Sequence, residues 1–197
     1  MKNKKTYVLS IDQGSTSTRA VIYDENLNLI SNAQIKTKEI YPQYGWVEQN
    51  PNEIIDSVKK TIFRSIKEAN LKIEAIQSVG ITNQRESIVF WDKKTKLSLS
   101  NMISWQCLRG MDFCKSIKDT EIEIKINSAT GLKVDPYFSF SKIIWALNNN
   151  KKINESLKNN TLALGTIDSW IMFNILEFLI LILLILLMPQ GQDCSIH

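Results

Sequence analysis

Short apolar runs separated by polar turns mark the start of the chain. Residues 7–11 and 20–23 are rich in aliphatic and aromatic side chains, and each run predicts a strand. Because the segment between them is short, we expect the two strands to pair as an antiparallel hairpin. After a polar turn, residues 29–36 alternate apolar and polar side chains, which is typical of a half-buried strand. The pattern therefore predicts a three-stranded meander.

Helical spacing replaces this alternation after Pro51. Asn50 is a good N-cap, Pro51 fits the first helical position, and Glu53 adds a negative charge to the first turn. Apolar residues then recur at intervals of three and four, which predicts a scaffold helix with one buried face. The members of that face are Ile54, Ile55, Val58, Ile62, Phe63 and Ile66.

Strands and helices continue to alternate further along the chain. Residues 73–81 predict a buried strand, and residues 87–91 and 162–165 predict two more. Residues 111–126 have a helical pattern, and further helices are predicted from 141, within 148–160 and from 166. The length of the chain is sufficient for one domain with a sizeable core.

The remaining segment, residues 174–197, differs from everything before it. Between Trp170 and Met188 only Asn174 and Glu177 are strongly polar. A bilayer takes about 20 apolar residues, so this run is nearly long enough to span one. A membrane anchor is therefore one interpretation of the tail, although the composition of the rest of the chain argues against it.

Composition excludes several classes of function. The formal charge is only +4, and the lysines are scattered, so we expect no nucleic-acid partner. Three cysteines without a CxxC pair, together with a single histidine, make a zinc site unexpected and suit a reducing compartment. Residues 7–11 are too short for a signal sequence. These features predict a cytoplasmic protein.

The turn between the first two predicted strands carries the first candidate chemistry. Its N–H and hydroxyl groups and one arginine could cradle an anion, and Gly14 lets a ligand approach the backbone. Asp12 could hold hydrated Mg²⁺, which takes one or two carboxylates plus phosphate oxygens. The alternative is an ordinary Ser/Thr-rich turn. The candidate phosphate ligands are Ser15, Thr16, Ser17 and Arg19.

Arg85 and Glu86 form the second candidate, directly after a predicted strand. Adjacent side chains of a strand point to opposite faces, so both can reach one ligand only if the chain turns there. The alternative is a surface ion pair of little energetic value. On the residues alone, Trp105 indicates a core tryptophan and Tyr137 a half-buried tyrosine with a satisfied hydroxyl.

Several stretches, in this order along the chain, resemble the FGGY carbohydrate kinases of the actin-like ATPase superfamily. The first is SIDQGSTSTRA at 10–20, and the later stretches narrow the resemblance to the glycerol kinases of that family. No single stretch is decisive, whereas the ordered set is specific. The later stretches are YPQYGWVEQNP at 41–51, GITNQRE at 80–86, WQC at 105–107, TGL at 130–132, DPYFS at 135–139 and GTIDSW at 165–170.

The quoted stretches extend from about residue 6 to 173, and this resemblance implies that these residues form an α/β, ribonuclease-H-like, actin-like ATPase domain with a mixed sheet flanked by helices. It also implies transfer of the γ-phosphoryl group of ATP to a terminal hydroxyl of glycerol, with ATP and Mg²⁺ as cofactors. The sequence does not determine the oligomeric state, and a homo-oligomer is compatible with it. By the resemblance, the phosphates would be held by Ser15, Thr16, Ser17 and Arg19, Mg²⁺ by Asp12, and glycerol by Arg85, Glu86, Trp105 and Tyr137. The sequence departs from the family at Leu108, where an arginine is usual.

The resemblance further implies that the catalytic aspartate and the adenosine-binding domain lie beyond the end of this chain. We therefore expect little or no turnover, which a coupled ADP-release assay tests. We interpret residues 174–197 as the product of a reading-frame shift, because one permitted set of codons for 183–195 encodes a family-like TDTSNASRTRLF in the neighbouring frame. Sequencing of the gene tests this hypothesis. The alternatives are a non-catalytic, membrane-tethered protein that binds nucleotide or polyol, and a xylulose or gluconate kinase.

Overall fold

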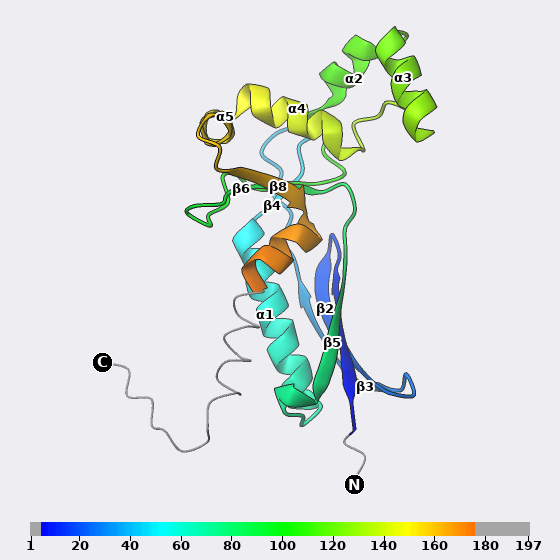
Figure 1. Cartoon of the computed structure of the whole chain (residues 1–197), viewed down its shortest axis with the longest axis vertical. Coiled ribbons are helices and arrows are strands. Elements are labelled where there is room, and N and C mark those ends of the chain that lie inside the picture. Colours follow the sequence, from blue (N-terminus) through cyan, green and yellow to red (C-terminus); the bar gives the residue numbers. More distant parts are fainter. Residues whose placement is uncertain (1–4, 176–197) are drawn as a thin grey trace, which may run out of the picture.

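The computed structural model describes residues 5–175, and its first sheet is the mixed sheet that the sequence predicts (Figure 1). The strand order is β3-β2-β1-β5. β1 pairs antiparallel with β2 and parallel with β5, while β2 pairs antiparallel with β3, so the predicted meander is confirmed. The strands are β1 (Tyr7–Gln13), β2 (Ser17–Asp24), β3 (Leu29–Lys36) and β5 (Ile76–Asn83), with a short 3₁₀ helix η1 (Ile73–Ala75) before β5.

Helix α1 (Pro51–Glu68) packs across β2 and β3 and begins as predicted. The Asn50 side chain accepts a hydrogen bond from the Asn52 N–H at 2.9 Å and so caps the first turn. Most of the predicted apolar face is buried, but Phe63 is 70 % exposed, and its assignment to that face is wrong. One residue corresponds to about 100° around a helix, so Phe63 points away from the sheet that Ile62 contacts.

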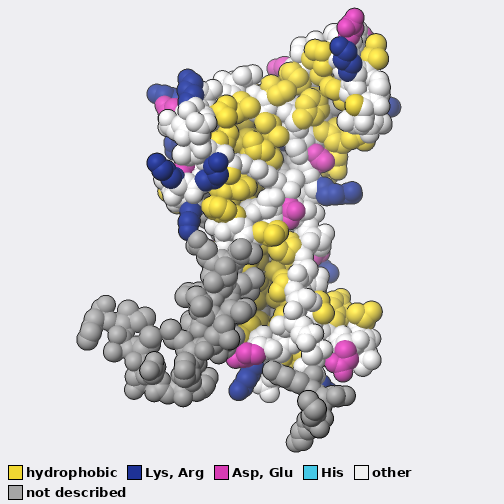
Figure 2. Space-filling model, in the orientation of Figure 1, with side chains coloured by type: hydrophobic (Ala, Val, Ile, Leu, Met, Phe, Trp, Pro, Cys, Tyr) yellow, Lys and Arg dark blue, Asp and Glu magenta, His cyan; other side chains and the backbone are white. Residues whose placement is uncertain are grey.

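The prediction that residues 73–81 lead into a buried strand is also wrong. β5 lies at the edge of the first sheet, and the side chains from Gln77 to Gly80 are exposed. Its apolar content reflects contact on one side only, where Ile76 and Ile81 pack against the core. Beside it, apolar residues of β1, α1 and β5 surround a hollow of about 300 Å³, and Figure 2 shows hydrophobic side chains along this part of the surface.

A second, antiparallel sheet lies between α1 and the remaining helices in Figure 1. Its strand order is β4-β7-β6-β8. The strands are β4 (Glu48–Gln49), β6 (Ile88–Asp92), β7 (Met102–Ile103) and β8 (Leu162–Thr166), and the helices are α2 (Met111–Ile117), α3 (Glu121–Thr130), α4 (Ser139–Asn149) and α5 (Lys151–Lys158). The helical pattern of 111–126 spans two helices, because Asp119 is left-handed (φ 59°) and interrupts it.

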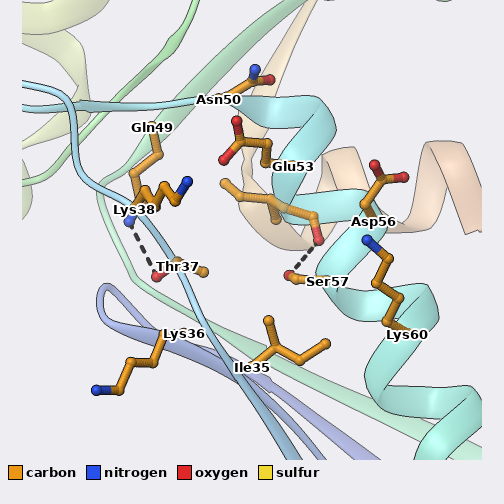
Figure 3. Close-up of a pocket in the computed structure, with 11 residues that line it drawn as sticks. Ile35, Lys36, Thr37, Lys38, Gln49, Asn50, Glu53, Asp56, Ser57 and Lys60 are labelled. Carbon is orange, nitrogen blue, oxygen red and sulfur yellow. Dashed lines mark hydrogen bonds between the residues drawn. The ribbon is translucent and has the colours of Figure 1, made fainter.

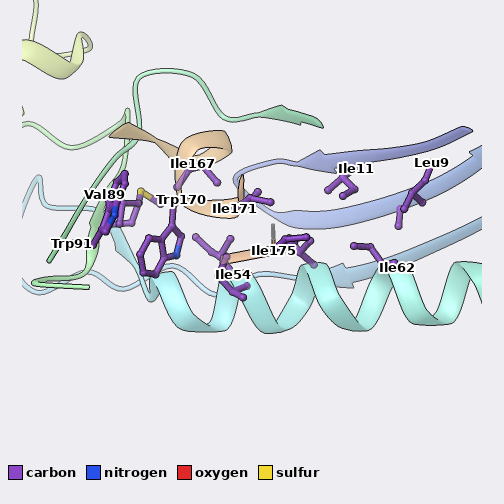
Figure 4. Packing of buried hydrophobic residues seen from close by; sticks show 14 of the residues in the cluster. Leu9, Ile11, Ile54, Ile62, Val89, Trp91, Ile167, Trp170, Ile171 and Ile175 are labelled. Atoms are coloured by element: carbon purple, nitrogen blue, oxygen red, sulfur yellow. The ribbon is translucent and has the colours of Figure 1, made fainter. Parts of the chain in front are cut away.

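Two apolar cores hold these layers together. The first lies between β1, β2, α1, a helix that begins at Ile167 and one face of the second sheet, and the second lies between the other face of that sheet, α4 and α5. Figure 4 shows Ile54 and Ile62 of α1 facing β1, with Trp170 close to Ile54. The Trp170 indole N–H donates to the Pro51 carbonyl at 3.0 Å, which fixes the last described helix to the start of α1.

Residues 5–175 contain no helix that is long and apolar enough to cross a membrane. Most of the apolar tail, from residue 176 onward, lies outside the described residues. Its two interpretations, as an anchor or as the product of a frameshift, therefore stay predictions, as does the domain boundary at 173.

Candidate functional site

The turn of the β1–β2 hairpin is held from behind and leaves two backbone donors available. The Gly14 N–H donates to the Ser17 carbonyl at 2.9 Å and closes the turn. The Ser15 carbonyl accepts hydrogen bonds from the Thr37 hydroxyl at 2.8 Å and from the Gln49 amide at 2.6 Å. Within residues 5–175, the N–H groups of Ser15 and Thr16 donate to no protein acceptor. Two such N–H groups at a fixed turn suit an anion.

The hydroxyl groups of this hairpin differ in what they contact. Thr18 is buried and shares a 2.7 Å hydrogen bond with the Ser57 hydroxyl of α1, so it serves the packing of the sheet. Thr16 is exposed, and the Ser17 hydroxyl accepts a hydrogen bond from Gln34 at 2.8 Å. Thr16 and Ser17 line a shallow hollow of about 350 Å³ together with Thr37. The outer hydroxyls of the hairpin, those of Thr16 and Ser17, are therefore accessible to a ligand, whereas that of Thr18 is not.

Asp12 and Arg19 lie directly opposite each other in the β1–β2 register, and both side chains are exposed. Strand alternation explains this position, because the neighbouring Gln13 and Thr18 point inward. No cluster of three or more metal-ligating residues occurs in the described part of the chain. Asp12 alone is consistent with Mg²⁺, which needs only one or two carboxylates when phosphate oxygens complete its shell.

Three of the four predicted polyol residues, Arg85, Trp105 and Tyr137, meet the hairpin at a second hollow, of about 260 Å³. The Trp105 indole N–H donates to the Ser15 hydroxyl at 2.9 Å, and the rings of Trp105 and Tyr137 are in edge-to-face contact with centroids 5.8 Å apart. Four segments that are distant in sequence thus form one concave surface. The residues around it are Gly14, Ser15, Asn83, Gln84, Arg85, Trp105 and Tyr137.

Glu86 lies next to this hollow but faces the start of α4. The chain turns at this residue, whose backbone is left-handed (φ 65°), a conformation that costs a non-glycine residue of the order of 1 kcal/mol or more. Its carboxylate accepts hydrogen bonds from the N–H and the hydroxyl of Ser139, at 2.7 and 2.8 Å. Arg85 lines the hollow, and Glu86 does not. The turn that the predicted Arg85–Glu86 pair required is present, and the role of Glu86 in binding stays a prediction.

A buried network of glutamine side chains connects the two parts of the site, and the sequence analysis did not single it out. The Gln84 amide donates to the side-chain oxygens of Gln13 and Gln49, at 3.1 and 2.8 Å. The Gln84 oxygen accepts from the Ser87 hydroxyl at 2.9 Å, and that hydroxyl in turn accepts from the Trp105 backbone N–H at 3.0 Å. The sequence did contain a signal for it, because a glutamine stands at or just after the end of each of three strands, where an inward-facing side chain would usually be apolar.

Arg109, the neighbour of Leu108, lines neither of these two hollows. Its guanidinium group forms a 2.5 Å ion pair with Glu48 and lies over the rings of Trp46 and Trp145, 4.0 and 4.8 Å from their centroids. It therefore joins the second sheet to α4. Leu108, the departure from the family, is exposed and packs against Gly45.

A further hollow of about 250 Å³ lies between α1 and the segment after β3 (Figure 3). Lysine and acidic side chains surround it, including Lys38, Lys60, Glu53 and Asp56. None of the predicted site residues lines it, but Thr37 and Gln49 of its wall both donate hydrogen bonds to the Ser15 carbonyl.

The sequence matches the FGGY family of carbohydrate kinases, N-terminal domain, over residues 7–180. It is 43 % identical over 173 residues to a glycerol kinase of Shewanella woodyi, covering 88 % of this chain and 35 % of that protein. A crystal structure of Plasmodium falciparum glycerol kinase with ADP is similar, with a TM-score of 0.79 and 31 % identity over 87 % of this chain and 34 % of the other. A ligand-bound xylulose kinase from Lactobacillus acidophilus shares the fold, with a TM-score of 0.75 and 24 % identity over 86 % of this chain and 33 % of the other.

The chain thus spans about a third of the length of the curated relatives that it matches. The structural similarity confirms the predicted actin-like ATPase fold, with its mixed sheet and flanking helices. By the extent of its sequence match, the chain belongs to the FGGY family of carbohydrate kinases and corresponds to the N-terminal domain of that family.

Proposed function

We propose that this chain provides the glycerol-binding wall and part of the phosphate-binding surface for ATP-dependent phosphorylation of glycerol to glycerol 3-phosphate. The observation that carries the proposal is the hydrogen bond from the Trp105 indole to the Ser15 hydroxyl. It joins the predicted polyol residues to the predicted phosphate turn across 90 positions of sequence. Glycerol is proposed as the polyol because several of the similar proteins are glycerol kinases.

In this proposal the polyol lies in the hollow between Arg85, Trp105 and Tyr137. The Arg85 guanidinium donates hydrogen bonds to the hydroxyl oxygen that receives the phosphoryl group. The Trp105 ring covers the carbon backbone, and the Tyr137 hydroxyl and the Glu86 carboxylate bind the remaining hydroxyls, which requires Glu86 to share its carboxylate with Ser139. Close positioning of this kind is the main contribution that a protein makes to phosphoryl transfer.

The phosphates of ATP lie along the hairpin. The Ser15 and Thr16 N–H groups, the Ser17 hydroxyl and the Arg19 side chain face the developing negative charge, which such donors stabilise. Asp12 would hold Mg²⁺, which supplies charge neutralisation between the phosphates when bound. The exposure of Thr16, Arg19 and Asp12 is compatible with ligands that approach from outside this chain.

Isothermal titration of glycerol into the purified chain tests the proposal. The Arg85→Ala variant should bind glycerol at least about tenfold more weakly, because a hydrogen bond to a charged group contributes about 1.5 to 3 kcal/mol. Arg64→Ala is the matched control, since Arg64 is an exposed arginine on α1, and it should bind like the wild type. Equal affinity of Arg85→Ala and wild type would overturn the proposal. Parallel titrations with xylulose and gluconate decide between glycerol and the related substrates.

A further inference from the structure

The strongest unexplained feature near the site is a lysine buried beneath it. Lys142 lies in the first turns of α4 and is 0 % exposed. Its ammonium group donates to three successive backbone carbonyls, those of Pro136 at 2.7 Å, Tyr137 at 2.6 Å and Phe138 at 3.4 Å. These carbonyls belong to the turn that carries the Tyr137 ring. The lysine therefore holds one wall of the hollow from behind.

Two energetic costs oppose a lysine at this buried position. Burial of an ammonium group is strongly unfavourable unless hydrogen bonds and opposite charges compensate for lost hydration. A positive charge near the N-terminus of a helix is also opposed by the helix dipole. Burial lowers the pKa of Lys142 from its ordinary value of 10.5 to about 8, against the opposite influence of Cys107, Glu86, Cys114 and Asp135. An apolar side chain of similar length would avoid both costs.

The three bonded carbonyls stand between the two groups that the proposed polyol site needs. On one side, the Tyr137 ring contacts the ring of Trp105. On the other, the Ser139 N–H and hydroxyl hold the Glu86 carboxylate. A rotation of this turn would move the Tyr137 ring and release Glu86 together. One ammonium group thus fixes both ends of the wall.

We infer that Lys142 is a positioning residue of the polyol site, which acts by fixing the carbonyls of residues 136–138 and thereby the places of Tyr137 and Glu86. The inference rests on the proposed function, because it assigns Tyr137 and Glu86 to polyol binding. Lys142 itself contacts no ligand. Its contribution is a hydrogen-bonded platform beneath the hollow.

Amide hydrogen exchange without ligand tests first whether Lys142 fixes the turn of residues 136–138. In the Lys142→Met variant, the amides of Tyr137 and Ser139 should exchange with solvent at least about tenfold faster than in the wild type, while those of β1 and β2 keep their protection. Lys142→Arg, which retains several donors, should restore protection at both positions. Unchanged exchange at Tyr137 and Ser139 in a folded Lys142→Met chain would overturn the inference.

A double-mutant cycle then separates positioning from a general structural effect. Lys142→Met should weaken glycerol binding by about tenfold in the wild-type background and by a smaller factor in the Tyr137→Phe background, because the part of its effect that acts through the Tyr137 hydroxyl is already absent there, whereas the part that acts through Glu86 remains. Equal losses in both backgrounds would contradict the inference. If the wild-type chain does not bind glycerol, the proposed function fails, whereas the exchange experiment still decides the role of Lys142.

Lys142→Gln replaces Lys142→Met where the latter does not fold, since its shorter amide cannot reach all three carbonyls. The same thresholds apply to it. Unfolding of both variants, with a folded Lys142→Arg chain, would assign the lysine to the stability of the whole domain and would overturn its specific role at the wall.

Discussion

The polyol wall and the phosphate hairpin of this domain differ in how their side chains are supported. Behind the wall, Gln84 joins Gln13, Gln49 and Ser87 in a buried network, and Lys142 holds the turn of Tyr137. At the hairpin, the outer groups such as Thr16 are exposed, and the backbone rather than the side chains is fixed. The difference implies that changes behind the wall affect folding and binding together, whereas changes at the outer hairpin affect binding alone.

Replacement of Gln84, at the centre of the network behind the wall, should have the largest effect on the free energy of unfolding. Gln84→Leu leaves the side-chain oxygens of Gln13 and Gln49 and the Ser87 hydroxyl without their partner, and each unsatisfied buried group costs about 1 to 3 kcal/mol. We expect the free energy of unfolding, from urea denaturation, to fall by about 3 kcal/mol. Gln77→Leu, on the exposed edge of β5, is the control and should change it by less than about 0.5 kcal/mol. A loss below about 1 kcal/mol in Gln84→Leu would show that the network does not support the wall.

The lowered pKa of the buried Lys142 predicts that the free energy of unfolding rises with pH in the alkaline range. Between about 8, the pKa in the native chain, and the ordinary value of 10.5, the unfolded chain retains the proton and the native chain does not. The free energy of unfolding of the wild type, relative to Lys142→Met, should therefore rise with pH, by about 1.4 kcal/mol per unit of pKa difference. Urea denaturation of both chains from pH 7 to 10.5 measures it. A difference that stays constant or falls over this range would contradict the burial of a charged amine under the wall.

Thr18 and Thr16 allow a comparison between a buried and an exposed hydroxyl of the hairpin, with smaller expected changes in stability. Thr18→Val removes the hydrogen bond to Ser57 and leaves that hydroxyl buried, so we expect a loss of about 1 kcal/mol in the free energy of unfolding. Thr16→Val, at an exposed position, should leave stability within about 0.5 kcal/mol of wild type. Equal effects at the two positions would remove the distinction between structural and ligand-facing hydroxyls.

Much of the first sheet could be predicted from the sequence, because alternation and short turns specify strands that are neighbours in the chain. Residues 29–36 were assigned correctly for this reason. The edge position of β5 could not be predicted, because apolar Ile76 and Ile81 show that one side is buried and do not show whether the other side is covered. The same limit applies to Phe63, which has the composition of the core but lies on the wrong side of α1.

The site was predictable where its residues carry an evident ligand chemistry, and its support was not. The hollow brings together Ser15, Arg85, Trp105 and Tyr137, whose grouping came from the family resemblance rather than from periodicity. Gln84 and Lys142 have side chains that are exposed in most proteins, so their burial depends on contacts between distant segments. Such contacts leave no local pattern in the sequence.

The indole N–H of Trp105 offers the most direct test that the hairpin and the wall form one polyol site. The chain has five tryptophans, and their indole signals can be followed by ¹⁵N–¹H NMR during a titration with glycerol. The account predicts a saturable shift of the Trp105 signal, lost in Arg85→Ala, with little change at Trp91 and Trp170 in the first core. A Trp105 signal that does not respond to glycerol, or that responds no more than those of Trp91 and Trp170, would contradict it.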